Sequence, residues 1–424
     1  MLNLESIAAV EAARFGEHFV RPIYDGYGFA AIPGTIERVL TGTSASALPP
    51  AAIPGGLTHH ETVILLLIDS FGWCFCAPRA ERYPFLRQFL AQGVISQLTT
   101  MFPSTTAAHV TTIHTGLPPA ASGIFEWFLY EPAIDRIIAP LLFSYAGEHD
   151  RETLATAGVN PAKIFPADTL YRRLAAAGVR STVLQHSAYA NSSFSRIVCA
   201  GAEMVAYRTL AEAITLLNQR LTTQQGPTYY MLYIDTIDTI CHNYGPEAPH
   251  VDAEIDTVLT TLDRLLQPAL ASLGRPGLLL LTADHGHIAT DPRKALLVNR
   301  LVPELVQATP SGADGKPLAP GGSSRDLFLY VAATQRAALQ ATLSAQLQGR
   351  AEVYPTAELV AEGFFGPQPS PAFLARIGDL VILPYAGETV WWDDPRFKQR
   401  FRGMHGGLTA AEAHTELAAL VYGG

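Results

Sequence analysis

The chain has 424 residues, of which 48% are hydrophobic and 16% are charged, a balance typical of a well-buried globular protein and not of a disordered one. This length allows two or three domains, although large α/β enzymes often form a single core of this size. The net charge of -9 argues against a binder of nucleic-acid polymers, which needs a basic face, but not against a small anionic substrate held by metal cations.

The N-terminal segment MLNLESIAAVEAARFGEHF carries Glu5, Glu11 and Arg14 inside its apolar stretch. A signal peptide has a basic segment followed by an apolar one, so we do not expect one here. No apolar run approaches the ~18 residues needed to span a bilayer. We therefore expect a soluble, cytoplasmic protein without membrane contact.

Apolar, strand-like runs alternate with segments of helical period, which predicts a parallel sheet covered by helices on both faces. The expected strands are Val63–Ile68, Ser181–Gln185, Tyr229–Ile234 and Leu278–Thr282. The expected helices are Ala107–His114, Asp168–Ala177, Leu210–Leu221 and Val251–Leu266, the last of which ends before Pro268.

Aspartate and histidine residues stand where the strand-like runs stop. They are Asp69 after VILLLI, Asp238 and His242 after YYMLYIDTI, Asp284 and His285 after GLLLLTA, and His405 in RGMHGG. In parallel sheets the ligand sites collect beyond the carboxyl ends of the strands. Taken singly, each has an ordinary alternative, such as a helix cap, a solvated Asp–His pair or a turn histidine. Together they predict two three-ligand metal sites.

Local spacing supports this hypothesis. Asp238 and His242 lie one helical turn apart on one face. Gly286 permits the sharp turn that adjacent Asp and His ligands need, and the glycines around His405 let a late loop reach a distant site.

Thr106, in FPSTT, precedes the expected helix Ala107–His114. A hydroxyl at a helix N-terminus lies where free N–H groups favour anions, which suits a nucleophile that attacks phosphorus. An ordinary N-cap is the alternative, and Ser104 or Thr105 could take either role.

The pattern changes after His287. Thr309–Ser324 is rich in Gly, Pro and Ser and predicts an exposed loop. After it we expect the strand Asp326–Val331, the helix Gln335–Gln348 and the strand Ala351–Tyr354, and then a return to the core through Asp379–Leu383. This predicts a small α+β cap insertion at residues 301–375, with the core formed by 1–300 and 376–424.

The four cysteines form no CxxC pair. Cys74 and Cys76 could be half of a metal site, but two buried thiols are the simpler interpretation.

The segments LLLIDSFGW, FPSTTAAHVTTIHTGLPPAASGI, YIDTIDTICHNYGP, LTADHG and GMHGG, in this order, resemble the alkaline phosphatase superfamily. The branch they resemble is the type I phosphodiesterase/nucleotide pyrophosphatase family. The resemblance covers most of the chain and implies an alkaline-phosphatase-like three-layer α/β/α sandwich.

It also implies a two-metal phosphodiesterase that acts on a small-molecule phosphodiester or nucleotide. The implied ligands are Asp238, His242 and His405 for one ion, and Asp69, Asp284 and His285 for the other, which Thr106 also touches. Thr106 would attack phosphorus, and a metal-activated water would hydrolyse the phospho-threonine. Oxygen and imidazole ligands without a thiolate suit two zinc ions, and manganese is also chemically reasonable.

Two positions depart from the family pattern. The usual Asp-Gly at the first ligand is Asp69-Ser70, for which we expect the flexibility of Gly72 to compensate. Glu126-Trp127 stands where nucleotide pyrophosphatases carry an Asn that donates to a phosphate oxygen. Trp127 and Tyr244 are candidates for substrate contact, although unplaced aromatic residues more often belong to the core.

Other polar residues receive supporting roles. His109 and His114 are expected to pack or to lie at the surface, His287 to orient a ligand or phosphate, and Asp235 to cap or support the Asp238 segment. A phosphomonoesterase, phosphonate hydrolase or phosphomutase on the same core is the alternative activity, and a catalytically silent metal-binding protein is the alternative of another class. A sulfatase is disfavoured because no C/S-x-P-x-R segment is present.

Overall fold

The computed structural model describes residues 1–44, 46–148 and 150–423. Its centre is an eight-stranded sheet of order β1-β5-β21-β12-β4-β11-β9-β10. The strands are β1 (Leu2–Asn3), β4 (Thr62–Ile68), β5 (Val94–Thr99), β9 (Arg180–His186), β10 (Glu203–Tyr207), β11 (Thr228–Ile234), β12 (Gly277–Thr282) and β21 (His414–Tyr422). Only β21 runs antiparallel to its neighbours, β5 and β12.

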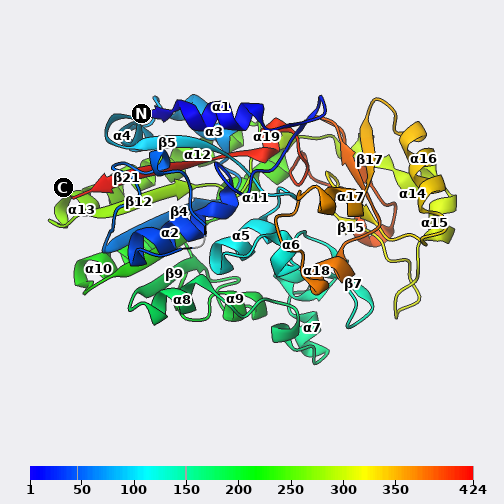
Figure 1. Ribbon diagram of the computed structural model, residues 1–424, viewed down its shortest axis with the longest axis horizontal. Helices are drawn as coiled ribbons and strands as arrows, with labels where there is room; N and C mark the ends of the chain where they lie inside the picture. Colours follow the sequence, from blue (N-terminus) through cyan, green and yellow to red (C-terminus); the bar gives the residue numbers. More distant parts are fainter. Residues whose placement is uncertain (45, 149, 424) are drawn as a thin grey trace.

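Helices cover both faces of this sheet (Figure 1). Along β4, Val63, Leu65 and Leu67 enter one apolar core, whereas the alternate residues enter the other. The first core contains residues of α2 (Ile32–Thr41), α5 (Thr106–Thr115), α8 (Leu170–Ala176) and α9 (Ser193–Val198). The second contains residues of α3 (Trp73–Arg79), α4 (Pro84–Gln92), α10 (Leu210–Thr223), α12 (Pro249–Thr261) and α13 (Gln267–Ser272). The predicted three-layer α/β/α sandwich is confirmed.

Shorter elements connect these layers. The helices are α1 (Leu4–Ala12), α6 (Pro119–Ser122), α7 (Thr153–Thr156), α11 (Thr236–Tyr244) and α19 (Ala410–Ala413). The strands are β2 (Arg14–Phe15) with β3 (Phe19–Val20), β6 (Leu129–Glu131) with β7 (Arg136–Ala139) and β8 (Ser144–Tyr145), β13 (Ile288–Ala289) with β20 (Gly403–Met404), and β14 (Leu296–Leu297) with β19 (Val390–Trp391).

A second sheet of order β15-β16-β18-β17 lies at the end of the molecule opposite the chain termini (Figure 1). Its strands are β15 (Gly321–Gly322), β16 (Leu327–Leu329), β17 (Ala351–Pro355) and β18 (Leu380–Pro384). The accompanying helices are α14 (Val298–Leu301), α15 (Glu304–Ala308), α16 (Arg336–Gln346), α17 (Thr356–Ala361) and α18 (Pro371–Arg376).

Three sequence predictions are wrong in this region and in the core. The strand at Asp379–Leu383 is not a return to the core, because β18 pairs with β16 and β17 inside the small sheet. The segment Thr309–Ser324 is exposed only in part, since residues 318–324 are buried. The helix after Val251 does not end before Pro268; a π-turn at Leu262–Leu266 leads into α13, whose first turn accommodates the proline.

Within the described part of the chain, no helix is both long and apolar enough to cross a membrane. The cysteines are free, and Cys76 is buried while Cys74 is half-buried. Neither lies in a group of described side chains with the spacing of metal ligands.

Candidate active site

Three neighbouring strands deliver the acidic residues to one edge of the sheet. β12, β4 and β11 are adjacent and parallel, with Thr282 opposite Leu67 and Ile234 opposite Ile68. The chain therefore leaves all three strands at the same level. This register brings Asp69, Asp284 and the start of α11 together.

The turn after Asp69 is held by close backbone packing. Ser70 adopts a left-handed conformation with φ 69°, and its N–H donates to Asp284 Oδ1 at 2.9 Å. Gly72 has an ordinary negative φ, but a Cβ there would lie 2.7–2.8 Å from three backbone atoms of residues 285, 286 and 414. The expectation that Gly72 provides flexibility is therefore wrong: Ser70 itself makes the turn, and Gly72 permits a close approach of backbones.

The first ligand group consists of Asp69, Asp284 and His285. His285 Nε2 lies 3.5 Å from Asp69 Oδ1 and 3.4 Å from Asp284 Oδ2. Both carboxylate oxygens are buried and have no hydrogen-bond partner among the described residues. The other oxygen of Asp69 accepts a hydrogen bond from the Tyr233 hydroxyl.

The second group is centred on Asp238 Oδ1, which also has no hydrogen-bond partner in the described chain. It lies 3.4 Å from His242 Nε2, 3.7 Å from His287 Nδ1 and 3.8 Å from His405 Nε2. The rings of His405 and His285 stack with their centroids 3.6 Å apart, so the two groups adjoin. The structure thus brings the six predicted ligands to one place but groups them differently from the prediction. Asp238 and His242 form a group with His287, whereas His405 forms a group with Asp238 and His285.

Backbone carbonyls orient three of these imidazoles. The Nδ1 of His242 donates to Gly403 O at 2.8 Å, that of His285 to Gly286 O at 3.0 Å and that of His405 to Ser104 O at 3.0 Å. The proton on Nδ1 leaves the Nε2 lone pair free to bind a metal.

The buried carboxyl groups and neutral imidazoles of the site favour bound cations. Burial raises the pKa of Asp69 and Asp284, and raises that of Asp238 to about 6. Burial also lowers the pKa of His285 and His405, which keeps both imidazoles neutral. Crowded carboxylates beside neutral imidazoles, with unpartnered oxygens facing one another, fit divalent metal ions.

Thr106 opens α5, and its Oγ1 lies 3.2 Å from His285 Nε2. The neighbouring hydroxyls are engaged elsewhere. Thr105 is the N-cap of α5 and its Oγ1 donates to Phe125 O, while the Ser104 hydroxyl pairs with that of Thr100 at 2.7 Å. Thr105 and Ser104 are buried, whereas Thr106 is partly exposed. Of the three, Thr106 has the hydroxyl that a substrate can reach.

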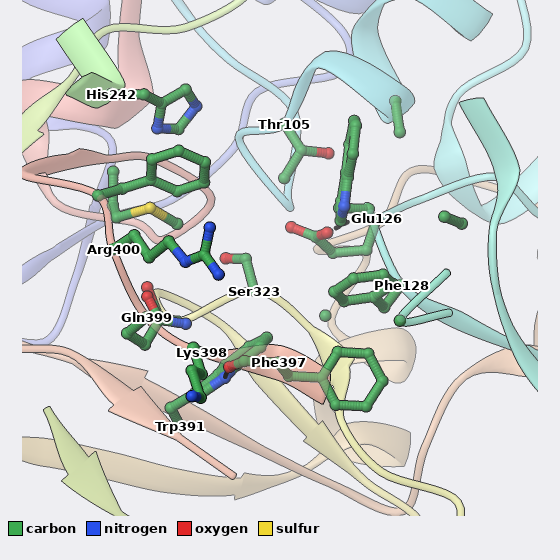
Figure 2. A pocket seen from close by; sticks show the side chains of 18 of the residues that line it. Thr105, Glu126, Phe128, His242, Ser323, Trp391, Phe397, Lys398, Gln399 and Arg400 are labelled. Atoms are coloured by element: carbon green, nitrogen blue, oxygen red, sulfur yellow. Dashed lines mark hydrogen bonds between the residues drawn. The ribbon is translucent and has the colours of Figure 1, made fainter. Parts of the chain in front are cut away.

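A cavity of about 650 Å³ opens beside Thr106, Asp238, His242 and His405. Figure 2 shows it from close by. Aromatic side chains line much of it: Trp127, Phe128, Trp391, Phe397 and Phe401. A smaller cavity of about 180 Å³ is also lined by Thr106, Trp127 and Asp238.

The two aromatic candidates differ in position. Trp127 is 39% exposed and lines both cavities. Tyr244 lines neither; its ring stacks on His250 with centroids 3.9 Å apart, so its predicted role in substrate contact has no geometric support.

Glu126, at the position of the departure from the family pattern, is fully buried in the wall of the larger cavity. Its Oε2 accepts from the Trp127 backbone N–H, and its Oε1 has no donor among the described residues. Asp326 packs beside Glu126 and is also fully buried, and burial raises the pKa of both carboxyl groups.

Three further polar residues bind structural partners, and a fourth, His287, does so through only one of its nitrogens. His109 accepts from Met101 N at 2.9 Å, and His114 pairs with the Tyr171 hydroxyl at 2.6 Å. Asp235 stands at the N-cap position of α11, but its carboxylate accepts from Tyr189 at 2.9 Å instead of capping the helix. His287 contacts the Ser70 hydroxyl at 2.5 Å through Nδ1, and its buried Nε2 has no partner in the described chain.

Comparison with known protein families identifies the chain. The family described as type I phosphodiesterase / nucleotide pyrophosphatase matches residues 63–408. The chain belongs to this family. A search of curated proteins finds no match.

Solved structures share the fold at low sequence identity. Murine ectonucleotide pyrophosphatase / phosphodiesterase 5 has 16% identity and a TM-score of 0.63, with 84% of this chain and 87% of that chain covered. An inactive form of that murine protein has been solved in complex with AMP, with the same identity and coverage. Phosphonoacetate hydrolase from Sinorhizobium meliloti 1021, in complex with phosphonoformate, has 19% identity and a TM-score of 0.60, with 84% and 89% covered.

The sequence predicts the role of His287 only in part, and it does not predict the partner of Glu126. His287 was expected only to orient other groups, although its position in DHGH, two residues after His285, is a signal for a further ligand. The partner of Glu126 could not be foreseen, because Asp326 lies in the small sheet region, far along the chain.

Proposed function

We propose that this protein is a two-metal phosphodiesterase of the nucleotide pyrophosphatase type that acts through a phospho-threonine intermediate. The carrying observation is the large aromatic-lined cavity beside Thr106 and the second ligand group, because a diester needs room for a second ester group. The family and the fold support the reaction class.

The residues divide by position. Asp69, Asp284 and His285 would hold one divalent ion. Asp238, His242 and His405 would hold the other, with His287 as a further nitrogen at Asp238. The oxygen and nitrogen donors favour zinc, with manganese as the alternative. When bound, such ions stabilise charge on phosphoryl oxygens and make hydroxyl groups and water more acidic.

Thr106 is the proposed nucleophile. Its position at the start of α5 places the reacting phosphoryl group at a helix N-terminus, where the free N–H groups favour negative charge. The contact between Thr106 Oγ1 and His285 orients the hydroxyl towards the first ligand group. Trp127 and the other aromatic walls would bind the ester group of a small-molecule diester or nucleotide and exclude water.

Hydrolysis of bis(p-nitrophenyl) phosphate and p-nitrophenyl phosphate tests the proposal, with metal-stripped protein to which zinc or manganese is restored. We expect metal-dependent turnover that favours the diester. A preference for the monoester would instead establish a phosphatase or mutase, and two tightly bound metals without turnover would establish a silent metal-binding protein.

A further inference from the structure

Three basic side chains line the larger cavity, outside the metal-ligand groups. They are Arg396, Lys398 and Arg400, and they come from one short segment, PRFKQRF, between β19 and β20. The chain as a whole has 29 basic against 38 acidic residues, so this segment departs locally from the acidic character of the protein.

The three basic groups differ in what they contact. Arg396 is bound by Asp394, whose Oδ1 accepts from its Nε at 3.0 Å and whose Oδ2 accepts from a terminal nitrogen at 2.9 Å. Lys398 and Arg400 are exposed at the cavity, and neither side chain forms an ion pair or a hydrogen bond with a described residue. Figure 2 shows the Arg400 side chain extending into the cavity. Two positive charges are therefore available there to a ligand.

The carboxylates that line the same cavity do not neutralise these charges. Asp238 belongs to the metal-ligand groups, and Glu126 is fully buried and accepts from the Trp127 N–H. Glu148 is exposed and forms no ion pair with either cation in the described chain. The countercharge for the two basic groups must come from solvent ions or from a bound ligand.

The basic segment is held at both ends, so the fold sets where its side chains lie. Before it, Trp391 Nε1 donates to Phe397 O at 2.6 Å, and the buried Phe397 ring packs against Phe128 with centroids 5.4 Å apart. After it, the Phe401 ring lies against the ring of His242 with centroids 4.6 Å apart. The residues between span the cavity wall from an aromatic cluster to a proposed metal ligand.

An ester group in this cavity would meet both the aromatic walls and the basic segment. Aromatic side chains favour a planar ring, and a guanidinium forms paired hydrogen bonds with the oxygens of a phosphate or a carboxylate. Arg400 directly precedes Phe401, which contacts a proposed metal ligand, so the basic group stands close to the reacting phosphate. Resting on the proposed function, we propose that Arg400, with Lys398 as a second positive charge, selects diesters whose ester group in this cavity is a planar ring that carries a phosphate or a carboxylate.

Two diesters that differ by one carboxylate test this selection. p-Nitrophenyl phenyl phosphate and p-nitrophenyl 4-carboxyphenyl phosphate both release p-nitrophenol, and only the ring that stays on phosphorus differs. For the wild-type enzyme we expect kcat/KM to be higher on the carboxylated diester on the order of 10-fold, the scale of one charge-assisted hydrogen bond. In Arg400→Gln the two values should become equal.

The matched control is Arg402→Gln. Arg402 is exposed and lies two residues further along the chain, but it does not line the cavity. Its replacement changes the net charge by the same amount, so a general attraction of anions would weaken equally in both variants. We expect Arg402→Gln to keep the wild-type ratio of the two kcat/KM values. An equal loss of that ratio in the two variants would overturn the role of Arg400.

Binding of the corresponding monoesters gives a readout without turnover. Calorimetry on the metal-loaded protein compares phenyl phosphate with 4-carboxyphenyl phosphate and with 1,4-phenylene bisphosphate. We expect the last two to bind wild-type protein on the order of 10-fold more tightly than phenyl phosphate does, and Arg400→Gln to lose this difference. The tighter of the two identifies whether the basic segment prefers a phosphate or a carboxylate.

These outcomes separate the anion site from the proposed activity. Wild-type protein that binds the two substituted monoesters more tightly but cleaves neither diester would overturn the proposed function and retain the anion site. Equal kcat/KM on the two diesters, with equal affinity for the three monoesters, would overturn the anion site and retain the phosphodiesterase.

Discussion

Among three consecutive hydroxyl residues, burial and hydrogen bonding distinguish one. The hydroxyls of Ser104 and Thr105 form hydrogen bonds with the Thr100 hydroxyl and with Phe125 O, which hold the loop in place. Thr106 lines the cavity. The residue that caps the helix and the residue proposed to react are therefore different. This division lets the cap hold the nucleophile still without consuming it.

Replacement of Thr106 by alanine should abolish turnover while both metals stay bound. We expect a loss on the order of 10³-fold or more in kcat, because no other described hydroxyl at this loop is accessible. Thr111→Ala is the matched control, since that hydroxyl lies on the same helix and donates to Ala107 O at 2.7 Å. An active Thr106→Ala enzyme would transfer the role to Thr105 or Ser104.

Asp238→Asn should lower the metal content, because Asp238 Oδ1 is the common neighbour of three imidazoles. The measurement is metal stoichiometry by elemental analysis after dialysis. Asp235→Asn, in the same segment but bound to Tyr189, should retain the full content. Equal stoichiometry in the two variants would remove Asp238 from the site.

At the scale of elements, the site depends on backbones that approach one another closely. The chain turns at Ser70 directly after β4. Two other segments, the loop after β12 and the start of β21, place backbone atoms against Gly72. The late histidine is held in the same way. Pairing of β20 with β13, which directly follows His287, places His405 beside the ends of the central strands.

Gly72→Ala should therefore destabilise the protein by about 1–3 kcal/mol, the usual cost of forcing extra atoms into packed structure. Its Cβ would meet backbone atoms, which cannot rotate away as a side chain can. Gly26→Ala is the control, because its Cβ would make only an ordinary contact of 3.5 Å with Ile23. Denaturant unfolding compares the two, and equal stabilities would refute the tight packing.

At the scale of the whole molecule, a buried ion pair joins the two sheets. Arg325, just before β16 of the small sheet, is bound to Glu412 of α19 beside the large sheet, and both side chains are fully buried. Glu412→Gln leaves the guanidinium without its countercharge and should cost about 3–5 kcal/mol of unfolding free energy. The exposed pair Arg21–Glu362 offers the contrast, and Glu362→Gln should cost less than about 1 kcal/mol. A small loss for Glu412→Gln in denaturant unfolding would contradict the prediction.

Metal binding should also stabilise the whole molecule, increasingly as pH rises. Below about 6 the raised pKa of Asp238 keeps that carboxyl protonated, and a metal must displace the proton to bind. Above that pH the Asp238 carboxyl group is already ionised, so the increase in melting temperature caused by zinc should become larger as pH rises through about 6. At a metal concentration of 100 times Kd each site contributes about 2.7 kcal/mol. Calorimetry with and without chelator checks this, and a gain independent of pH would contradict it.

The amino-acid sequence by itself determined the sandwich and the candidate ligands, because strands buried on both faces are continuously apolar and a polar residue that ends one stands out. Asp69, Asp284 and Asp238 were visible in this way, and the ordered motifs indicated the family. The antiparallel strand β21 was missed, as was the place of β18 in the small sheet, because period and polarity do not specify which strand pairs with which.

Only the tertiary structure decided three further matters. It showed Tyr244 stacked on His250 outside the cavities, it brought His287 to Asp238, and it set Asp326 against Glu126. Each depends on contacts between segments far apart in the chain or on the direction in which a side chain points. A carboxylate's neighbours, and hence its proton, follow from packing, which no local pattern of residues encodes.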